Sequence, residues 1–165
     1  KFLSGEPIAV KPEMFIGAAA NPFAEPFDFR VHRLAKKIAA GADFFQTQCI
    51  YNMERFREFV KQANDMGLTE KAYLLAGVTP MKSLGMAKYM KKSVPGIDVP
   101  DSIIKRLEGV EKKQQADEGI RMCCEQIEEF KEMKGLAGVH LMAIEWEHRV
   151  PEIVERAKLL PRPQV

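Results

Sequence analysis

The sequence predicts an α/β protein made of four consecutive strand–helix units, half the number in a (β/α)8 TIM barrel. Short apolar runs alternate along the chain with longer stretches of helical periodicity. The apolar runs end at turn signals or polar residues, as at Asn21-Pro22 and Thr79-Pro80. A complete barrel takes about 250 residues, whereas this chain has 165. We therefore expect half of a barrel, completed by the same polypeptide or by another chain.

The composition is that of an ordinary globular domain, with 46% hydrophobic residues, 29% charged residues and a net charge of +2. We treat residues 1–165 as one domain in which the turn-rich residues 1–13 are a lead-in segment. The near-neutral charge argues against a nucleic-acid partner. No apolar run approaches the roughly 20 residues that span a bilayer. Three cysteines without a C-x-x-C spacing favour a reducing, cytoplasmic compartment.

The first unit begins with the apolar run Met14–Ala20, which predicts a buried strand. The small residues at its end are poor strand formers, so we expect a bulky group to pack against this backbone. A loop follows, in which Asp28 is placed to cap the next helix. That helix begins at Arg30, and Gly41 ends it at the position of a C-terminal cap.

This helix carries a row of like charges on the face opposite its apolar residues, namely Arg30, Arg33, Lys36 and Lys37. Each like-charge pair costs an isolated helix roughly 0.2–0.5 kcal/mol. A nearby phosphate or diphosphate would relieve the repulsion. The alternative interpretation is an ordinary solvated helix face.

The strand predicted at residues 43–49 places Phe44, Gln46 and Gln48 on one face. Two amides on an otherwise apolar face are costly unless a partner binds them. The remaining elements are a helix between Asn52 and Gly67, a strand at 72–78, helices at 83–90, 102–107 and 111–134, a strand at 138–144, and a helix at 150–160 that ends at the Pro-Arg-Pro run 161–163.

Active sites of such barrels lie at the carboxyl ends of the strands. Those ends carry the polar residues Asn21, Gln48, Thr79 and Glu145, although turn chemistry alone also favours polar residues there. No strand-end lysine suits a Schiff base. The histidines His32, His140 and His148 lack metal-ligand spacing, so we expect no metal site. Cys123 and Cys124 fit core packing, and the stripe Met81, Met86 and Met90 fits either core packing or a pocket for a flat ring.

The stretches FIGAAANP, LAKKIAAGADFFQTQ, LLAGVTP and GVHLMAI resemble the methylenetetrahydrofolate reductases, in the last four units of their catalytic barrel. The resemblance implies bound FAD. It also implies hydride transfer from NADH or NADPH to the flavin, and then to 5,10-methylenetetrahydrofolate as substrate. No catalytic residue is assigned to this chain, because the catalytic glutamate of the family belongs to the other half.

Carried over by position, the resemblance implies a set of cofactor-binding residues and a set of substrate-binding residues. The cofactor-binding residues are Asn21, Glu25, Arg33, Lys36, Lys37 and Gln46. The substrate-binding residues are Gln48, Met86 and Met90. Two positions depart from some members of this family: Arg30 stands where they have an aspartate that binds flavin ribose, and Met90 where they have an aromatic residue that stacks on the substrate.

Two other functions stay open. A half-barrel with open sheet edges could be a non-catalytic subunit that completes a partner's barrel, within a homo-oligomer or with a partner subunit. Another phosphate-binding barrel enzyme, such as an aldolase, is disfavoured by the missing strand-end lysine.

Overall fold

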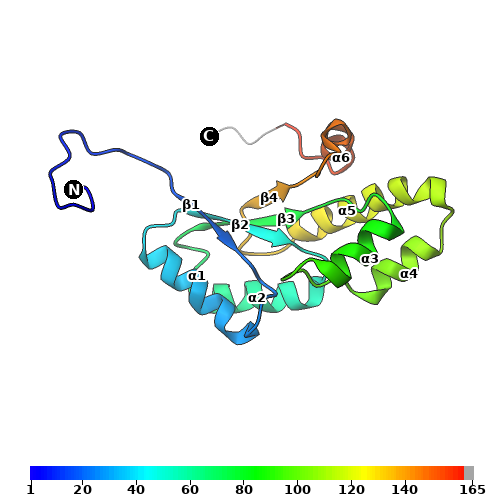
Figure 1. Cartoon of the computed structure of the whole chain (residues 1–165), viewed down its shortest axis with the longest axis horizontal. Coiled ribbons are helices and arrows are strands. Elements are labelled where there is room, and N and C mark those ends of the chain that lie inside the picture. Colours follow the sequence, from blue (N-terminus) through cyan, green and yellow to red (C-terminus); the bar gives the residue numbers. More distant parts are fainter. Residues whose placement is uncertain (162–165) are drawn as a thin grey trace.

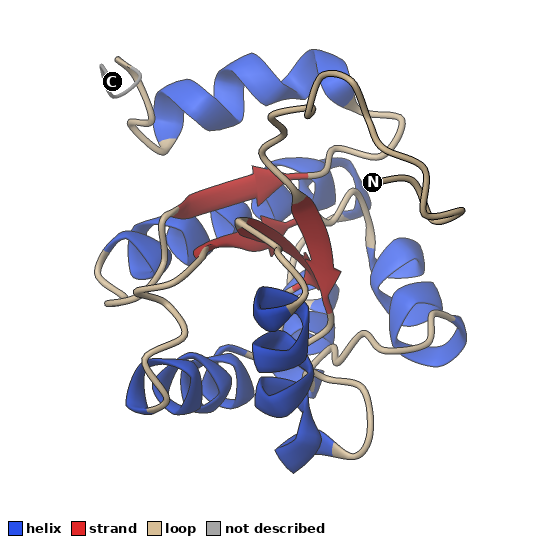
Figure 2. Cartoon of the chain, turned by 90° about the vertical axis from the view of Figure 1, so that its left-hand side faces the viewer, coloured by secondary structure: helices blue, strands red, loops and turns tan. Residues whose placement is uncertain are grey.

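The computed structural model describes residues 1–161, which form one parallel sheet with helices packed around it (Figure 1, Figure 2). The strands, in their order across the sheet, are β1 (Gly17–Ala20), β2 (Phe44–Cys49), β3 (Tyr73–Val78) and β4 (Gly138–Leu141). The α-helices are α1 (Arg30–Ala39), α2 (Met53–Asp65), α3 (Leu84–Ser93), α4 (Asp101–Glu108), α5 (Gln115–Lys131) and α6 (Val150–Arg156). Parallel strands alternating with helices confirm the predicted α/β order, with β1 and β4 as edge strands.

The main core lies between the sheet and the helices. Phe45 and Leu74 from the strands pack with Phe56 and Phe59 of α2 and with Ile127 of α5, and each is at most 1% exposed. Burying one such side chain stabilises the fold by about 1.5–3 kcal/mol. The predicted alternation along β2 is confirmed by its burial pattern, because Phe45 and Thr47 are buried while Gln46 is exposed.

The helix ends follow the predicted signals in most places. Asn52 caps α2, since its Oδ1 accepts a hydrogen bond from the backbone N–H of Arg55 at 3.0 Å. Gly41 follows α1 with φ of 100°, in the left-handed region. The predicted cap by Asp28 is wrong. Asp28 lies inside a 3-10 turn, Phe27–Phe29, and Phe29 occupies the cap position without a side-chain bond.

Several predicted bounds differ from the structure. The sheet-forming part of the first strand begins at Gly17 instead of Met14, and β4 ends at Leu141 instead of Ile144. The predicted helix 111–134 is a 3-10 turn, Lys112–Gln114, followed by α5, and the last helix ends at Arg156 after the turn Glu147–Arg149. Of the Pro-Arg-Pro run, residues 162 and 163 lie outside the described residues.

The sheet face away from the main core is open to solvent near the start of the strands. Phe15 is 66% exposed and Tyr73 60% exposed, and the ring of Phe15 stacks on Phe44 with 5.3 Å between centroids. Exposure of residues 14–16 corrects the predicted buried strand, because no described element covers them. The bulky neighbour expected beside the small residues is the Phe44 ring, which occupies the space that a Cβ on Gly17 would need. The lead-in residues 1–13 extend away from the sheet (Figure 1).

Candidate functional site

A cavity of about 410 Å³ lies at the carboxyl ends of β1 and β2, beside α1. Its lining combines small residues, amides and cations: Ala19, Ala20, Asn21, Arg30, Arg33, Leu34, Lys37, Gln46, Thr47, Gln48, Phe59 and His140. The structure thus brings together five of the predicted site residues, Asn21, Arg33, Lys37, Gln46 and Gln48. The other four, Glu25, Lys36, Met86 and Met90, do not line this cavity.

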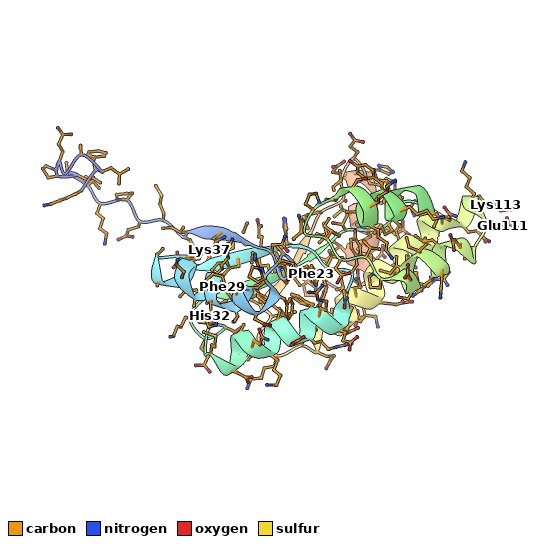
Figure 3. All side chains as sticks on the ribbon, turned by 60° about the horizontal axis from the view of Figure 1, so that its bottom comes forward. Phe23, Phe29, His32, Lys37, Glu111 and Lys113 are labelled. Atoms are coloured by element: carbon orange, nitrogen blue, oxygen red, sulfur yellow. The ribbon has the colours of Figure 1, made fainter. Side chains whose placement is uncertain are left out.

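The cationic row of α1 contributes three of its four members to the cavity. Lys37 lies toward β1, on a different side of α1 from His32 (Figure 3), and its Nζ donates to the carbonyl of Ala19 at 2.5 Å. Arg30 is only 7% exposed, and its guanidinium donates to the carbonyls of Pro26 and Glu25. These carbonyl bonds hold the cations in place without neutralising them.

No member of this row forms an ion pair with a carboxylate of residues 1–161. A charge as buried as that of Arg30 is normally paired, because desolvation is costly. The cavity therefore carries uncompensated positive charge at the end of a small-residue strand, which is a good environment for a phosphate or pyrophosphate. Lys36 is exposed and belongs to the solvated part of the helix.

The geometry at the end of β2 depends on a β-bulge. The β2–β3 register runs from Gln46 opposite Leu75 to Cys49 opposite Gly77. Two residues of β2, Thr47 and Gln48, therefore lie opposite the single residue Ala76 of β3, so β2 has one extra residue. The Thr47 hydroxyl replaces a ladder bond by accepting from the Gly77 N–H at 2.7 Å. Bulges often re-aim side chains beside functional sites. This one explains why Thr47 and Gln48, consecutive residues of a strand, both line the cavity.

His140 is a cavity residue that sequence reasoning missed. It lies on β4 and its Nδ1 is 3.3 Å from Nε2 of Gln46, which lies 94 residues earlier in the chain. In the sequence, His140 is the single polar side chain within the apolar run 138–144, and this feature could have indicated a role for it. Only the sheet order shows that this residue faces Gln46.

The remaining predicted residues lie elsewhere. Glu25 approaches Arg55 at 3.7 Å and accepts from the backbone N–H of Phe27, away from the cavity. Met90 is 5% exposed within a second apolar cluster, where its sulfur accepts from the Tyr51 hydroxyl at 3.4 Å. Met86 packs against the same cluster. The geometry gives both methionines a packing role, and their contact with substrate stays a prediction.

The cysteines are packed residues, as predicted for Cys123 and Cys124. Burial raises the pKa of the Cys123 thiol to about 12, and burial also raises the pKa of Cys49 and Cys124. These thiols are therefore protonated and poorly nucleophilic at neutral pH. Within the described part of the chain, no three His, Cys, Asp or Glu side chains are grouped to hold a metal ion. None of its helices is both long and apolar enough to span a membrane.

Four parallel strands alternating with helices place the chain in the class of TIM-barrel-type α/β proteins, with a cation-lined cavity at the strand ends. Comparison with known proteins refines this class. The family model for methylenetetrahydrofolate reductase matches residues 9–158. The chain belongs to the methylenetetrahydrofolate reductase family.

Individual relatives of the chain are also methylenetetrahydrofolate reductases, at low sequence identity. The chain is 25% identical over 146 residues to a probable methylenetetrahydrofolate reductase (NADPH) of Caenorhabditis elegans, which covers 85% of this chain and 22% of that protein. It is 27% identical over 136 residues to methylenetetrahydrofolate reductase 2 of Schizosaccharomyces pombe, covering 78% of this chain and 21% of that protein. The chain thus spans about a fifth of the length of these curated relatives.

A solved structure shares the fold. An uncharacterized protein from Clostridium thermocellum, which binds two copies of 5-methyl-5,6,7,8-tetrahydrofolic acid, superposes with a TM-score of 0.62 at 20% identity. The match covers 90% of this chain and 54% of that protein. The strand–helix arrangement described above is therefore shared with a longer chain.

Proposed function

We propose that this chain is the part of a methylenetetrahydrofolate reductase that holds the pyrophosphate of FAD and one wall of the folate site. The observation that carries the proposal is the cavity at the strand ends, whose lining includes Arg30, Arg33 and Lys37 and no carboxylate. Hydrogen bonds from such cations to phosphate oxygens are charge-assisted and strong. The methyl side chains of Ala19 and Ala20 leave room for a ligand to approach the end of β1.

Six residues of the cavity have separate parts in this proposal. The guanidinium of Arg33 and the ammonium of Lys37 bind phosphate oxygens, and the carbonyl-anchored Arg30 contributes positive potential from the cavity wall. Gln48 anchors the pterin of the folate, and Gln46 and Asn21 contact the flavin side. Flavin supplies hydride chemistry when bound, with NADH or NADPH as donor, and the protein positions the reactants.

The proton needed to activate the folate substrate must come from elsewhere. General acid catalysis requires a titratable group within hydrogen-bond reach of the reacting atom. The described lining offers no carboxylate. We therefore assign the general acid to the other half of the barrel, in the same polypeptide or in a partner subunit.

A matched pair of variants tests the FAD proposal. Lys37→Met removes a cation that lines the cavity, whereas Lys36→Met removes the neighbouring cation that does not. We expect FAD to bind the full chain, as followed by quenching of flavin fluorescence. Lys37→Met should raise the dissociation constant about 10- to 100-fold, because a hydrogen bond to a charged group is lost. Lys36→Met should change it less than about twofold.

Two results would contradict the proposal. One is a wild-type chain that binds no FAD, and the other is an equal loss of FAD affinity in Lys37→Met and Lys36→Met. Thermal melts followed by circular dichroism check that Lys37→Met remains folded, since its ammonium also bonds to Ala19.

A second candidate is the non-catalytic half-barrel subunit, and the exposed ring of Phe15, which stacks on the partly buried Phe44, favours it. Aromatic side chains on an open sheet face suit a partner that supplies the missing strands. This candidate predicts purified chain without flavin that forms a stable complex with a second half-barrel. Sedimentation velocity and the visible spectrum of the complex distinguish the two functions.

A further inference from the structure

The two amides in the cavity wall differ in what determines their orientation: a backbone N–H orients Gln48, and an imidazole orients Gln46. Gln48 Oε1 accepts a hydrogen bond from the backbone N–H of Cys49 at 3.1 Å. Because a backbone N–H can only donate, the oxygen of this amide must face Cys49. The NH2 group of Gln48 has no acceptor among residues 1–161, so it remains a donor for a ligand in the cavity that Gln48 lines.

The orientation of Gln46 depends on His140. Nε2 of Gln46 lies 3.3 Å from Nδ1 of His140. The two side chains meet across β3, where Gly77, the register partner of His140, has no side chain to separate them. With Nδ1 unprotonated, the imidazole accepts from Gln46 and the amide oxygen remains free. With Nδ1 protonated, the amide must turn and present its NH2 instead.

We infer that His140 is a positioning residue, which holds Gln46 as an acceptor beside the donor Gln48 so that the cavity wall recognises a lactam or imide edge. Such an edge has a ring N–H next to a ring carbonyl. The N–H donates to Gln46 Oε1 and the carbonyl accepts from Gln48 Nε2. The cations of α1 line the same cavity, so the preferred ligand combines this edge with an anionic group.

The inference deepens the proposed function and rests on it, because both a flavin and a pterin carry such an edge. Family membership does not tell which hydrogen-bond donors and acceptors the cavity wall presents, or which side chain orients them. The flavin ligand FAD and the pterin ligand 5-methyltetrahydrofolate therefore need separate binding measurements.

The first measurement needs no ligand. Long-range proton–nitrogen NMR spectra of the full chain at pH 8 report the tautomer of each histidine. We expect His140 in the Nε2–H form, with Nδ1 as acceptor, and a mixture of tautomers in Gln46→Leu. The exposed His148, which does not line the cavity, should not change between the two proteins. An Nδ1–H tautomer of His140 in the wild-type chain would overturn the inference.

The second measurement compares ligands with and without the ring N–H. FAD and 5-methyltetrahydrofolate are each titrated beside an analogue that is methylated at N3. For whichever ligand uses this wall, methylation should weaken binding to the wild-type chain by about 2- to 10-fold, the value of one neutral hydrogen bond. In His140→Leu this ratio should fall to about one. His140→Asn, whose side-chain oxygen can replace Nδ1 as acceptor, should restore it, and His148→Leu should leave it unchanged.

The outcomes separate this inference from the proposed function. If the wild-type chain binds each ligand and its N3-methylated analogue with equal affinity, the inference is overturned and the FAD proposal stands. A ratio that persists in His140→Leu also overturns it, because Gln46 would then be held by another group. Wild-type chain that binds neither ligand overturns the proposed function, and with it the inference.

Discussion

Gly77→Ala is the sharpest test of how β2 presents its side chains. A Cβ at this position would meet the backbone carbonyls of Thr47 and Gln48, the latter at 2.7 Å. Backbone atoms of a paired strand cannot rotate away as a flexible side chain can, so the bulge itself must shift. The shift would also lengthen the 2.7 Å hydrogen bond from the Gly77 N–H to the Thr47 hydroxyl.

The expected loss of stability follows from these two contacts. Overpacking typically costs about 1–3 kcal/mol, and a lost hydrogen bond costs about 0.5–1.5 kcal/mol. We therefore expect the free energy of unfolding to fall by roughly 2–4 kcal/mol, measured by urea denaturation followed by circular dichroism. Gly85→Ala in α3 is the control, because its nearest neighbour, the Ser83 hydroxyl, is 3.7 Å away. That change should be neutral or stabilising by up to about 1 kcal/mol.

Ordinary surface substitutions change the free energy of unfolding by at most about 0.5 kcal/mol. A Gly77→Ala protein within that range of the wild type would contradict the close packing of Gly77 against the bulge. Such a result would mean that the bulge adapts freely. The orientation of Gln48 would then not depend on the approach of β2 to Gly77.

Two further predictions concern the candidate site and the buried thiols. Under the proposed function, Gln48→Ala in a protein that contains both barrel halves should weaken reduction of 5,10-methylenetetrahydrofolate far more than oxidation of NAD(P)H by an artificial acceptor. Equal losses in the two half-reactions would contradict the proposed pterin role of Gln48. Burial raises the pKa of Cys123 from 9.0 to about 12, so the stability contributed by its neutral form is complete below pH 9 and is lost as the pH rises toward 12. Urea midpoints measured between pH 8 and 11 should therefore fall more steeply for the wild type than for Cys123→Ala, and parallel curves would show that this thiol does not titrate as its burial requires.

Most of the fold could be predicted from local patterns. Val31 and Leu34 recur on one face of α1 and are both buried, and Asn52 caps α2. The like charges of α1 allowed two interpretations, a solvated helix face or a nearby anion, and the structure places Arg33 and Lys37 in one cavity with Gln48. These features depend on residues close together in the chain, where helical and strand periodicity determine which side chains share a face.

Other parts of the site depended on contacts between distant segments. Even within one segment, helical periodicity does not identify Arg30 as the buried member of the row, because its guanidinium donates to the carbonyls of residues 25 and 26 in the preceding loop. Met90 has the spacing of a pocket residue, and only the folded chain shows that it packs in the second apolar cluster with Tyr51, which lies 39 residues earlier.

The order of strands and helices, the cationic row of α1 and the amides near the end of β2 can be predicted from the sequence, because each is a property of consecutive residues. The bulge of Thr47 and Gln48 beside Gly77 and the contact of His140 with Gln46 arise only when the strands pair. Register between strands is set by packing across the sheet, and no pattern within one strand encodes which residue of another strand lies beside it.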